Sequence, residues 1–252
     1  MTAIRRTLAG LGLAAAIAAP AMAFDIGDMS EGERAQFRAE IRDYLLENPE
    51  VLMEAISVLE GRQAQAQAVA DNDLVAANAD ALFDDGVSWV GGNPDGDLVL
   101  VEFMDYRCGY CKKAYDEVNQ LVESDGNIKF IVKEFPILGE DSVKAARFAV
   151  AVKLVADDTA YEKVHDALMT LRGNVTDDTL ARIGKDAGVD VAAVTAKMDD
   201  PAVTAELQAN HELAGKLSIS GTPTFIMGDE ILRGYLPLDS MRQVAEQERG
   251  EG

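Results

Sequence analysis

The sequence predicts an α/β protein, and three segments support that prediction. Residues 98–104 form an apolar run interrupted only by Glu102, which is typical of a central strand covered on both faces. Residues 141–217 carry a helical pattern almost throughout. Residues 224–227 and 230–233 flank a Gly-Asp turn and predict a hairpin. The expected order is strand, strand, helix, strand, several helices, hairpin and final helix.

The remaining elements follow from similar signals. Residues 87–90 are a short apolar stretch between two turn segments and predict the first strand. A helix is expected from the Cys108 region to about Glu123, a strand at 128–133 and a last helix from about Leu238. Within the long helical stretch we expect N-caps at Asp141-Ser142, Asp157-Asp158, Thr176-Asp177 and Asp200-Pro201.

The first residues have the pattern of a secretory signal peptide. Arg5 and Arg6 precede the apolar run 8–19, and the small-x-small sequence 21–23 follows it. The run is shorter than the roughly 20 residues of a membrane span. An uncleaved anchor is the alternative. Cleavage after Ala23 would export the chain to the periplasm, where disulfides can form and persist.

Composition excludes several functional classes. The formal net charge is −21, from 44 acidic and 23 basic residues, and such a charge repels phosphate backbones, so we expect no nucleic-acid partner. Hydrophobic residues make up 48% of the chain, which suffices for a substantial core. Two cysteines cannot staple a fold of this size, and with two distant histidines they make a poor zinc site. No cofactor or metal is expected.

Residues 24–85 predict a helical N-terminal segment. Ser30 and Glu33 fit a capping box, and Asn48-Pro49 fits the start of a second helix. One apolar stripe runs along both helices: Phe37, Ile41, Tyr44, Leu45, Leu52, Ala55, Ile56 and Leu59. Residues 63–81 hold few large apolar side chains and, if helical, should bury little. Residues 30–83 should therefore pack on the rest of the chain or form a homo-oligomer.

The reactive chemistry is expected at Cys108-Gly109-Tyr110-Cys111. This sequence follows a buried strand and opens a helix, so Cys108 stands where free backbone N–H groups and the helix dipole favour a thiolate. An ordinary thiol has a pKa of about 8.5 and is mostly protonated at pH 7. We therefore predict that Cys108 is an exposed, reactive thiolate.

Two other interpretations of the cysteine pair stay open. A structural disulfide closing so short a loop would contribute only about 2 kcal/mol, which makes a staple a weak explanation. A metal site, copper included, needs more ligands than two thiolates usually supply, and His165 and His211 have no metal-ligand spacing to either cysteine. A redox-active dithiol is the preferred hypothesis.

Two segments together resemble a known family. They are Val101-Glu102-Phe103-Met104-Asp105-Tyr106-Arg107-Cys108-Gly109-Tyr110-Cys111 and Ser220-Gly221-Thr222-Pro223-Thr224-Phe225. Together they resemble the DsbA family of thioredoxin-fold thiol-disulfide oxidoreductases, over about residues 87–248. This resemblance implies a catalytic domain at 86–252 with a helical insertion at about 139–217. Residues 42–52 are similar to the helical N-terminal segment of a bacterial subgroup related to ScsC.

The resemblance also implies roles for individual residues. The base rate of cis X-Pro bonds, about 5–6%, favours a trans Pro223, whereas the family implies a cis-proline opposite the nucleophile, with Thr222 backbone exposed to substrate. Glu102 would exchange the proton of Cys111, and Lys133 could pair with it; the alternative is a glutamate at a frayed strand end. Gly109 and Tyr110 would tune the helix amides beside the substrate.

The expected function is exchange of disulfides with secreted or periplasmic cysteine-containing proteins, together with a redox partner that resets the dithiol. The Gly109-Tyr110 dipeptide and Thr222 resemble the disulfide isomerases more than the DsbA oxidase, so we favour an isomerase or reductase. A DsbA-type dithiol oxidase is the first alternative. A copper-binding thiol protein is the alternative from another class.

Overall fold

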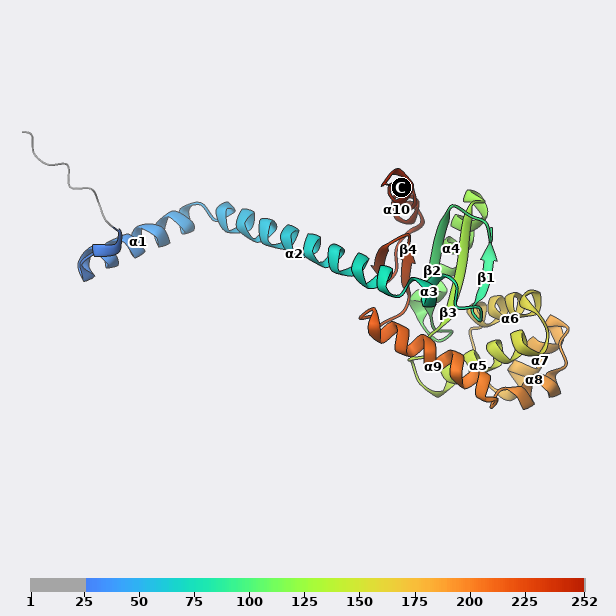
Figure 1. Ribbon diagram of the computed structural model, residues 1–252. Helices are drawn as coiled ribbons and strands as arrows, with labels where there is room; N and C mark the ends of the chain where they lie inside the picture. Colours follow the sequence, from blue (N-terminus) through green and yellow to red (C-terminus); the bar gives the residue numbers. More distant parts are fainter. Residues whose placement is uncertain (1–25, 252) are drawn as a thin grey trace, which may run out of the picture. The chain divides into compact units, whose positions relative to one another are not determined.

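The computed structural model describes residues 26–251, so the predicted signal peptide lies outside the described part of the chain (Figure 1). The chain divides into two compact units, Met1–Glu60 and Gly61–Gly252. Within residues 26–251, we find no helix with the length and apolar character needed to cross a membrane. The boundary expected at residues 85 and 86 stays a prediction.

The first unit is helical. A short 3-10 helix, Ile26–Asp28, precedes α1 (Glu31–Glu47) and the first turns of α2 (Glu50–Ala77). The capping box is confirmed, because Ser30 Oγ accepts from the backbone N–H of Glu33 at 3.3 Å and Glu33 Oε2 accepts from the Ser30 N–H at 2.9 Å. Asn48 closes α1 through its N–H bond to the Tyr44 carbonyl, so it caps the end of α1. No residue of α1 is buried.

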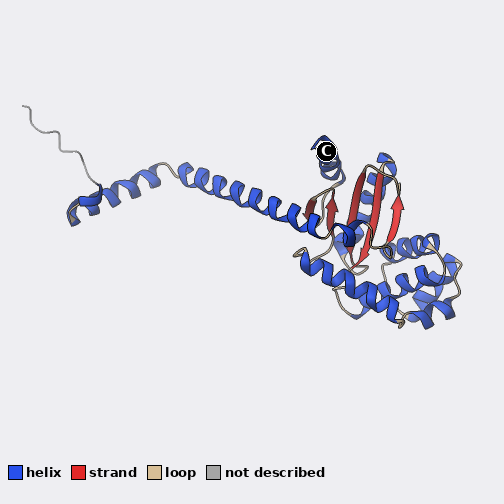
Figure 2. Ribbon diagram, viewed as in Figure 1, coloured by secondary structure: helices blue, strands red, loops and turns tan. Residues whose placement is uncertain are grey.

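The described residues form a five-stranded sheet in the order β1-β3-β2-β4-β5 (Figure 2). Strands β2 and β3 are parallel, and the other neighbouring pairs are antiparallel. The strands are β1 (Trp89–Gly92), β2 (Leu98–Met104), β3 (Ile128–Glu134), β4 (Thr224–Met227) and β5 (Glu230–Arg233). The central strand and the hairpin are confirmed as predicted.

The first strand begins two residues later than expected. Asp85 Oδ1 accepts the backbone N–H groups of Val87 and Ser88 at 3.0 and 2.9 Å, which forms a side-chain turn there. Because these two N–H groups are bound to Asp85, they are not available to the sheet. Pairing with β3 therefore begins at Trp89.

Helices flank the sheet and fill the segment between β3 and β4. Helix α4 (Gly109–Asp125), which begins directly after Cys108, and α10 (Leu238–Glu251) both contact sheet strands. Residues 135–223 hold α5 (Glu140–Val155), α6 (Asp158–Thr170), α7 (Asp177–Ala187), α8 (Val191–Lys197) and α9 (Pro201–Lys216). This is the predicted helical insertion.

Most of the helix caps in the insertion were predicted correctly. Asp157, Thr176 and Asp200 accept N–H groups of their first turns. Asp190 caps α8 in the same way and was not predicted. The cap of α5 is Gly139, not Asp141, because Asp141 already lies inside the first turn. A glycine suits this position, whose φ is 108°.

The sheet carries a hydrophobic core on each face. Alternate residues of β2 point to opposite faces, so Leu100 and Met104 join one cluster while Val101 and Phe103 join the other. The first cluster also contains Cys111 and other residues of α4. The face of β2 that carries even-numbered residues is therefore the face that lies against α4.

Within the second unit, the end of α2 packs against the sheet. Val75 and Leu82, the latter from α3 (Ala79–Phe83), are buried in the second cluster, at 2% and 0% exposure. Asp71 accepts two bonds from the Arg233 guanidinium, at 2.6 and 2.9 Å. The expectation that residues 63–81 bury little holds for residues 63–70, which are all exposed, whereas Asp71 and Val75 are buried and anchor the last turns of α2.

Candidate active site

Cys108 stands at the start of the catalytic helix, as predicted. It follows the end of β2 by four residues and is the N-cap of α4, with extended backbone at φ −73° and ψ 118°. Its Sγ accepts the backbone N–H of Cys111 at 3.3 Å. A sulfur in this position receives the field of the unpaired amides of the first helical turn.

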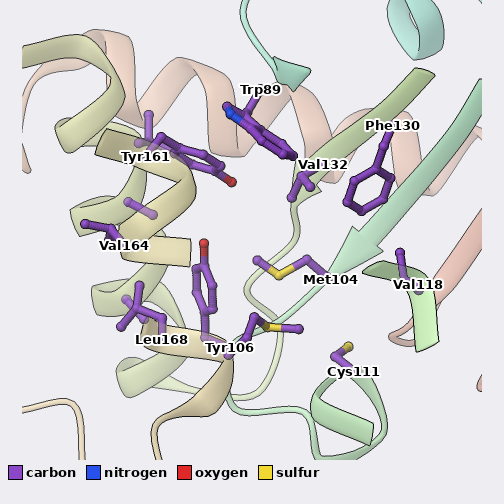
Figure 3. Packing of buried hydrophobic residues seen from close by; sticks show 14 of the residues in the cluster. Trp89, Met104, Tyr106, Cys111, Val118, Phe130, Val132, Tyr161, Val164 and Leu168 are labelled. Atoms are coloured by element: carbon purple, nitrogen blue, oxygen red, sulfur yellow. The ribbon is translucent and has the colours of Figure 1, made fainter. Parts of the chain in front are cut away.

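Both cysteines are free, and Cys108 is more enclosed than the sequence suggested. Cys108 keeps 6% of its surface exposed and Cys111 none. The predicted exposed thiolate is therefore wrong in its degree of exposure. The reason is the loop at Thr222, whose carbonyl oxygen lies 3.2 Å from Cys108 Sγ and accepts its proton in the thiol form. Figure 3 shows Cys111 among the buried residues of the first cluster.

The two thiols differ strongly in acidity. Hydrogen bonding from the Cys111 side chain lowers the pKa of Cys108 from 9.0 to about 6; burial opposes the shift, and the backbone N–H groups of Cys111 and Tyr110 add to it. A thiol with a pKa of about 6 is roughly 90% ionised at pH 7. Burial raises the pKa of Cys111 far above its ordinary value. Cys108 is thus the more acidic thiol of the pair, and Cys111 stays protonated at pH 7.

The Thr222–Pro223 peptide bond is cis. The base-rate expectation of a trans bond is wrong here, and the expectation drawn from the family resemblance is confirmed. The Pro223 carbonyl accepts the Gly234 N–H at 2.9 Å, which ties this loop to the end of β5. A pocket of about 280 Å³ lies beside the loop and is lined by Ser220, Gly221, Thr222, Pro223, Thr224, Arg233 and Gly234.

Glu102 lies on the face of β2 that meets the catalytic helix. It is 2% exposed and pairs in register with Val132 and Phe225, in the middle of the sheet. The alternative of a frayed strand end is therefore wrong. Burial, and then the nearby charge of Cys108, raise the pKa of Glu102 to about 8. Within residues 26–251, its Oε1 has no hydrogen-bond partner.

The predicted pairing of Lys133 with Glu102 is also wrong. Lys133 lies opposite Phe103 in the β2–β3 register, so it points to the other face of the sheet. Its Nζ binds Asp85 Oδ2 at 2.6 Å and the Ala81 carbonyl at 2.7 Å. Lys133 therefore helps to hold the segment that precedes β1.

Gly109 and Tyr110 begin the catalytic helix. Gly109 is the first residue of α4, and the Tyr110 side chain is 64% exposed beside the dithiol. The Tyr110 and Tyr235 ring centroids are 6.4 Å apart, and Lys113 Nζ lies 3.8 Å from the Tyr235 centroid. These groups form a rim beside the first turn of α4, in which Tyr110 and Lys113 are exposed and Tyr235 is half-buried.

Asp105 supports this site, although the sequence analysis did not single it out. Its carboxylate is 2% exposed and accepts four hydrogen bonds, from the backbone N–H groups of Arg107, Ile137 and Leu138 and from Ser142 Oγ, at 2.7 to 3.0 Å. Its carbonyl accepts the Cys108 N–H at 3.0 Å. Asp105 thus fixes the turn that leads into the dithiol. The only signal available was an acidic residue directly after a buried strand.

Fold and site together define the class of protein. A mixed sheet with a helical insertion, a cysteine that caps the helix after the central strand and a cis-proline opposite it are the parts of a thioredoxin-fold thiol-disulfide oxidoreductase. Residues 99–246 match the family model of the DSBA-like thioredoxin domain, and residues 33–66 match the copper resistance protein ScsC N-terminal domain. The chain belongs to the DSBA-like thioredoxin family and also carries an ScsC N-terminal domain.

Solved structures show the same relationship. A thioredoxin-like oxidoreductase from Silicibacter pomeroyi is 37% identical, with a TM-score of 0.64, and the match covers 68% of this chain and 97% of that one. ScsC of Proteus mirabilis, in a transitional conformation, is 31% identical with a TM-score of 0.65, covering 89% of this chain and 100% of that chain. The second match therefore includes most of the N-terminal helices.

The first curated relatives are longer proteins. The chain is 24% identical over 152 residues to the Na(+)/H(+) antiporter NhaA 1 of Salinispora arenicola, and the match spans 23% of that protein. Disulfide bond formation protein D of Bacillus subtilis is 22% identical over 167 residues, which is 75% of its length. The chain thus spans about a quarter of the relatives matched first.

Proposed function

We propose that this oxidoreductase works in the periplasm as a disulfide isomerase or reductase on cysteine-containing client proteins. The observation that carries the proposal is the contrast between an ionised, helix-capping Cys108 and a buried, protonated Cys111 beside the cis-Pro223 loop. A thiolate that is mostly free at pH 7 can attack a client disulfide without prior activation. The name of a similar structure, a periplasmic thioredoxin-like protein from Salmonella enterica, supports the location.

The reaction begins when the Cys108 thiolate attacks one sulfur of a client disulfide. A bond forms between Cys108 and that sulfur, and the other client sulfur leaves as a thiolate. If a client thiolate then attacks the mixed disulfide, the client leaves with a rearranged disulfide and no net redox change occurs. If Cys111 attacks instead, the client leaves reduced and the Cys108–Cys111 disulfide forms.

The second route requires that Cys111 lose its proton. Glu102 lies on the same face of β2, raises the pKa of Cys111 through its charge, and has a spare acceptor in Oε1. We assign Glu102 the role of proton acceptor for Cys111. In its ionised form it can take the proton as Cys111 attacks, and in its neutral form it can return the proton when the dithiol is regenerated.

The cis-proline loop and the exposed rim supply the client-binding residues. Thr222 borders the nucleophile through its carbonyl and can pair with an extended client backbone, while Pro223 holds that segment in place. Tyr110, in the first turn of the helix that Cys108 caps, offers an exposed ring. Gly109 has no side chain and leaves the approach to Cys108 open.

The acidity of Cys108 favours isomerase or reductase over strong oxidase. Lowering its pKa from 9.0 to about 6 stabilises the dithiol. At pH 7 this amounts to about 1.4 kcal/mol, or about 30 mV in reduction potential. Strong oxidants of the DsbA type have a thiol pKa near 3.5 and gain several times more. The disulfide of this chain should therefore be a moderate oxidant.

The exposed stripe on the N-terminal helices supports assembly of several copies. Ile41 is 44% exposed, Tyr44 is 54%, Ile56 is 47% and Leu59 is 55%, although all four are large apolar side chains at helical spacing. Burying such a stripe against identical helices would remove it from water. An oligomer would also present several dithiols to one client.

Ile41→Asp should therefore break up the assembly. Size-exclusion chromatography with light scattering should give an oligomeric mass for residues 24–252 and a monomeric mass for Ile41→Asp. Ala39→Asp adds the same charge to α1 away from the stripe, and it should keep the oligomeric mass. A monomeric mass for the unmodified chain, or one unchanged by Ile41→Asp, would reject assembly through this stripe.

The direction of exchange is tested by two assays on the same preparation. The glutathione redox equilibrium should give a moderate potential, and scrambled ribonuclease should regain activity without added oxidant. A strongly oxidising potential with no reshuffling would establish a dithiol oxidase instead. Stoichiometric copper(I) binding without activity on the scrambled substrate would favour the copper-binding alternative, although residues 33–66 contain neither cysteine nor histidine.

A further inference from the structure

A buried polar cluster lies directly behind the dithiol turn and has no part in the exchange chemistry described above. It consists of Tyr106, Glu134, Tyr161 and His165, which are exposed by 2%, 1%, 1% and 4%. Tyr106 belongs to the turn between β2 and α4, Glu134 ends β3, and Tyr161 and His165 come from α6. The cluster therefore connects the dithiol turn to the sheet and to the helical insertion.

Glu134 is the centre of this cluster. Its Oε1 accepts the hydroxyl of Tyr106 at 2.6 Å and the hydroxyl of Tyr161 at 2.7 Å. Figure 3 shows these two tyrosines from different elements with their hydroxyls directed toward each other. The Tyr106 hydroxyl also lies 3.1 Å from His165 Nδ1. One carboxylate oxygen thus binds the turn and the insertion at the same time.

The positions of the protons follow from the contacts. A phenol has one proton, and Tyr106 uses it to donate a hydrogen bond to Glu134 Oε1. The Tyr106 oxygen is then the acceptor toward His165, so His165 Nδ1 carries a proton and donates to it. Burial lowers the pKa of His165 to about 4, so the ring is neutral at pH 7. Burial also raises the pKa of Tyr106, so its hydroxyl stays a donor over the whole working range.

Burying this polar cluster costs free energy of folding. Within residues 26–251, Glu134 Oε2 is buried with no hydrogen-bond partner, and burial raises the pKa of Glu134 to about 8. An apolar side chain of similar volume would avoid these costs. A purely structural explanation therefore accounts poorly for a carboxyl group here.

Tyr106 lies within the turn that sets the position of the nucleophile. The Asp105 carbonyl accepts the Cys108 N–H at 3.0 Å, which closes a turn around Tyr106 and Arg107. Asp105 holds one side of this turn through its four hydrogen bonds, and Tyr106 holds the other through Glu134. Any rotation of the turn would move Cys108 Sγ relative to the Cys111 N–H that stabilises the thiolate.

We propose that Tyr106 and Glu134 are positioning residues that hold the dithiol turn against the helical insertion and so keep Cys108 Sγ aligned with the first amides of α4. They act on the thiolate through geometry and touch no client. The inference rests on the proposed role of Cys108 as nucleophile. It also gives the insertion a function, because α6 supplies the second phenol and the imidazole that orient this link.

The test compares two matched variants of the full chain. Tyr106→Phe and Tyr161→Phe each remove one buried hydroxyl from the same Glu134 oxygen, but only Tyr106 lies in the dithiol turn. The readout is the titration of Cys108, followed by thiolate absorbance and by the rate of alkylation at pH 5. Tyr106→Phe should slow alkylation at pH 5 by about threefold, which corresponds to half a pKa unit. Tyr161→Phe should lower the melting temperature while the Cys108 titration stays as in the unmodified chain.

Equal shifts in both variants, or no shift in a folded Tyr106→Phe, would overturn the proposal. If Tyr106→Phe does not fold, Glu134→Leu removes the acceptor instead and should also slow the alkylation of Cys108 at pH 5. An unchanged Cys108 titration in Glu134→Leu would overturn the proposal. Turnover of scrambled ribonuclease by the unmodified chain is measured in parallel. An inactive chain whose Cys108 titration still shifts in Tyr106→Phe contradicts the proposed function and leaves the positioning role supported.

Discussion

Replacing Cys108 by alanine should abolish turnover, with a loss of at least ~10³-fold, because the residue removed is the attacking sulfur itself. Cys111→Ala should behave differently. It keeps the helix-capping thiolate but removes the sulfur that resolves the mixed disulfide in the reductive route, so clients without a second free thiol should stay covalently attached to Cys108. Non-reducing electrophoresis and intact mass measurement of the trapped adducts would show this.

The two variants serve as controls for each other, since each replaces one thiol of the same pair by hydrogen and leaves a methyl side chain. Both cysteines are at least nine-tenths buried, so each variant is first shown to be folded by its melting curve. Similar residual activity in Cys108→Ala and Cys111→Ala would contradict the assignment of separate roles. Adducts that accumulate on Cys111 in Cys108→Ala would reverse the assignment.

Glu102→Gln should change how stability depends on pH. The folded state raises the pKa of Glu102 from 4.5 to about 8 and therefore binds its proton more tightly than the unfolded chain. The stability that comes from this tighter proton binding is fully present below pH 4.5 and is lost as the pH rises toward 8. The loss is on the order of 5 kcal/mol. Relative to the unmodified chain, Glu102→Gln should thus gain stability between pH 4.5 and 8, as measured by urea unfolding.

The same substitution should affect the resolving step. Glu102 becomes able to accept a proton as it ionises near pH 8, so release of client by Cys111 should speed up through that range. Glu102→Gln should release clients slowly and with no such rise, as followed by quenched-flow of the mixed disulfide. Glu140→Gln replaces an exposed carboxyl and should match the unmodified chain in both experiments. If the stability of Glu102→Gln and of the unmodified chain depended on pH in the same way, the pKa of Glu102 would not be raised by folding.

The sequence was sufficient to predict most of the secondary structure. The run at 98–104 and the hairpin were placed correctly, because a strand covered on both faces needs continuous apolar residues and a Gly-Asp turn is a strong local signal. The start of β1 was misplaced, because it depends on a side-chain turn at Asp85 that competes with the sheet. Local pattern cannot show which partner a backbone N–H will choose.

The site was predictable where it depends on local structure. A cysteine between a buried strand and a helix is placed at the helix start by the chain itself, which is why Cys108 was found. The pairing of Lys133 was misjudged, because it depends on strand register. Asp105, Tyr106 and Glu134 were missed, because their importance comes from hydrogen bonds to residues far away in sequence.

The cis bond before Pro223 could be predicted neither from local pattern nor from strand register. Local preference favours the trans isomer, and only the resemblance of residues 220–225 to a known family indicated the cis form. The packing of Asp71 and Val75 was missed for a related reason: a polar helix with two anchoring residues looks like a linker in sequence.

The most direct measurement is the ionisation of Cys108 in the reduced protein, followed by ultraviolet absorbance and by alkylation rate across pH 4 to 10. We expect a transition near pH 6. This transition belongs to Cys108 if it disappears in Cys108→Ala. In Cys111→Ala it should remain but move to a higher pH, because the hydrogen bond from the Cys111 side chain is lost. A thiol that ionises near pH 9 in the unmodified chain, or one that alkylating reagents cannot reach, would contradict this expectation.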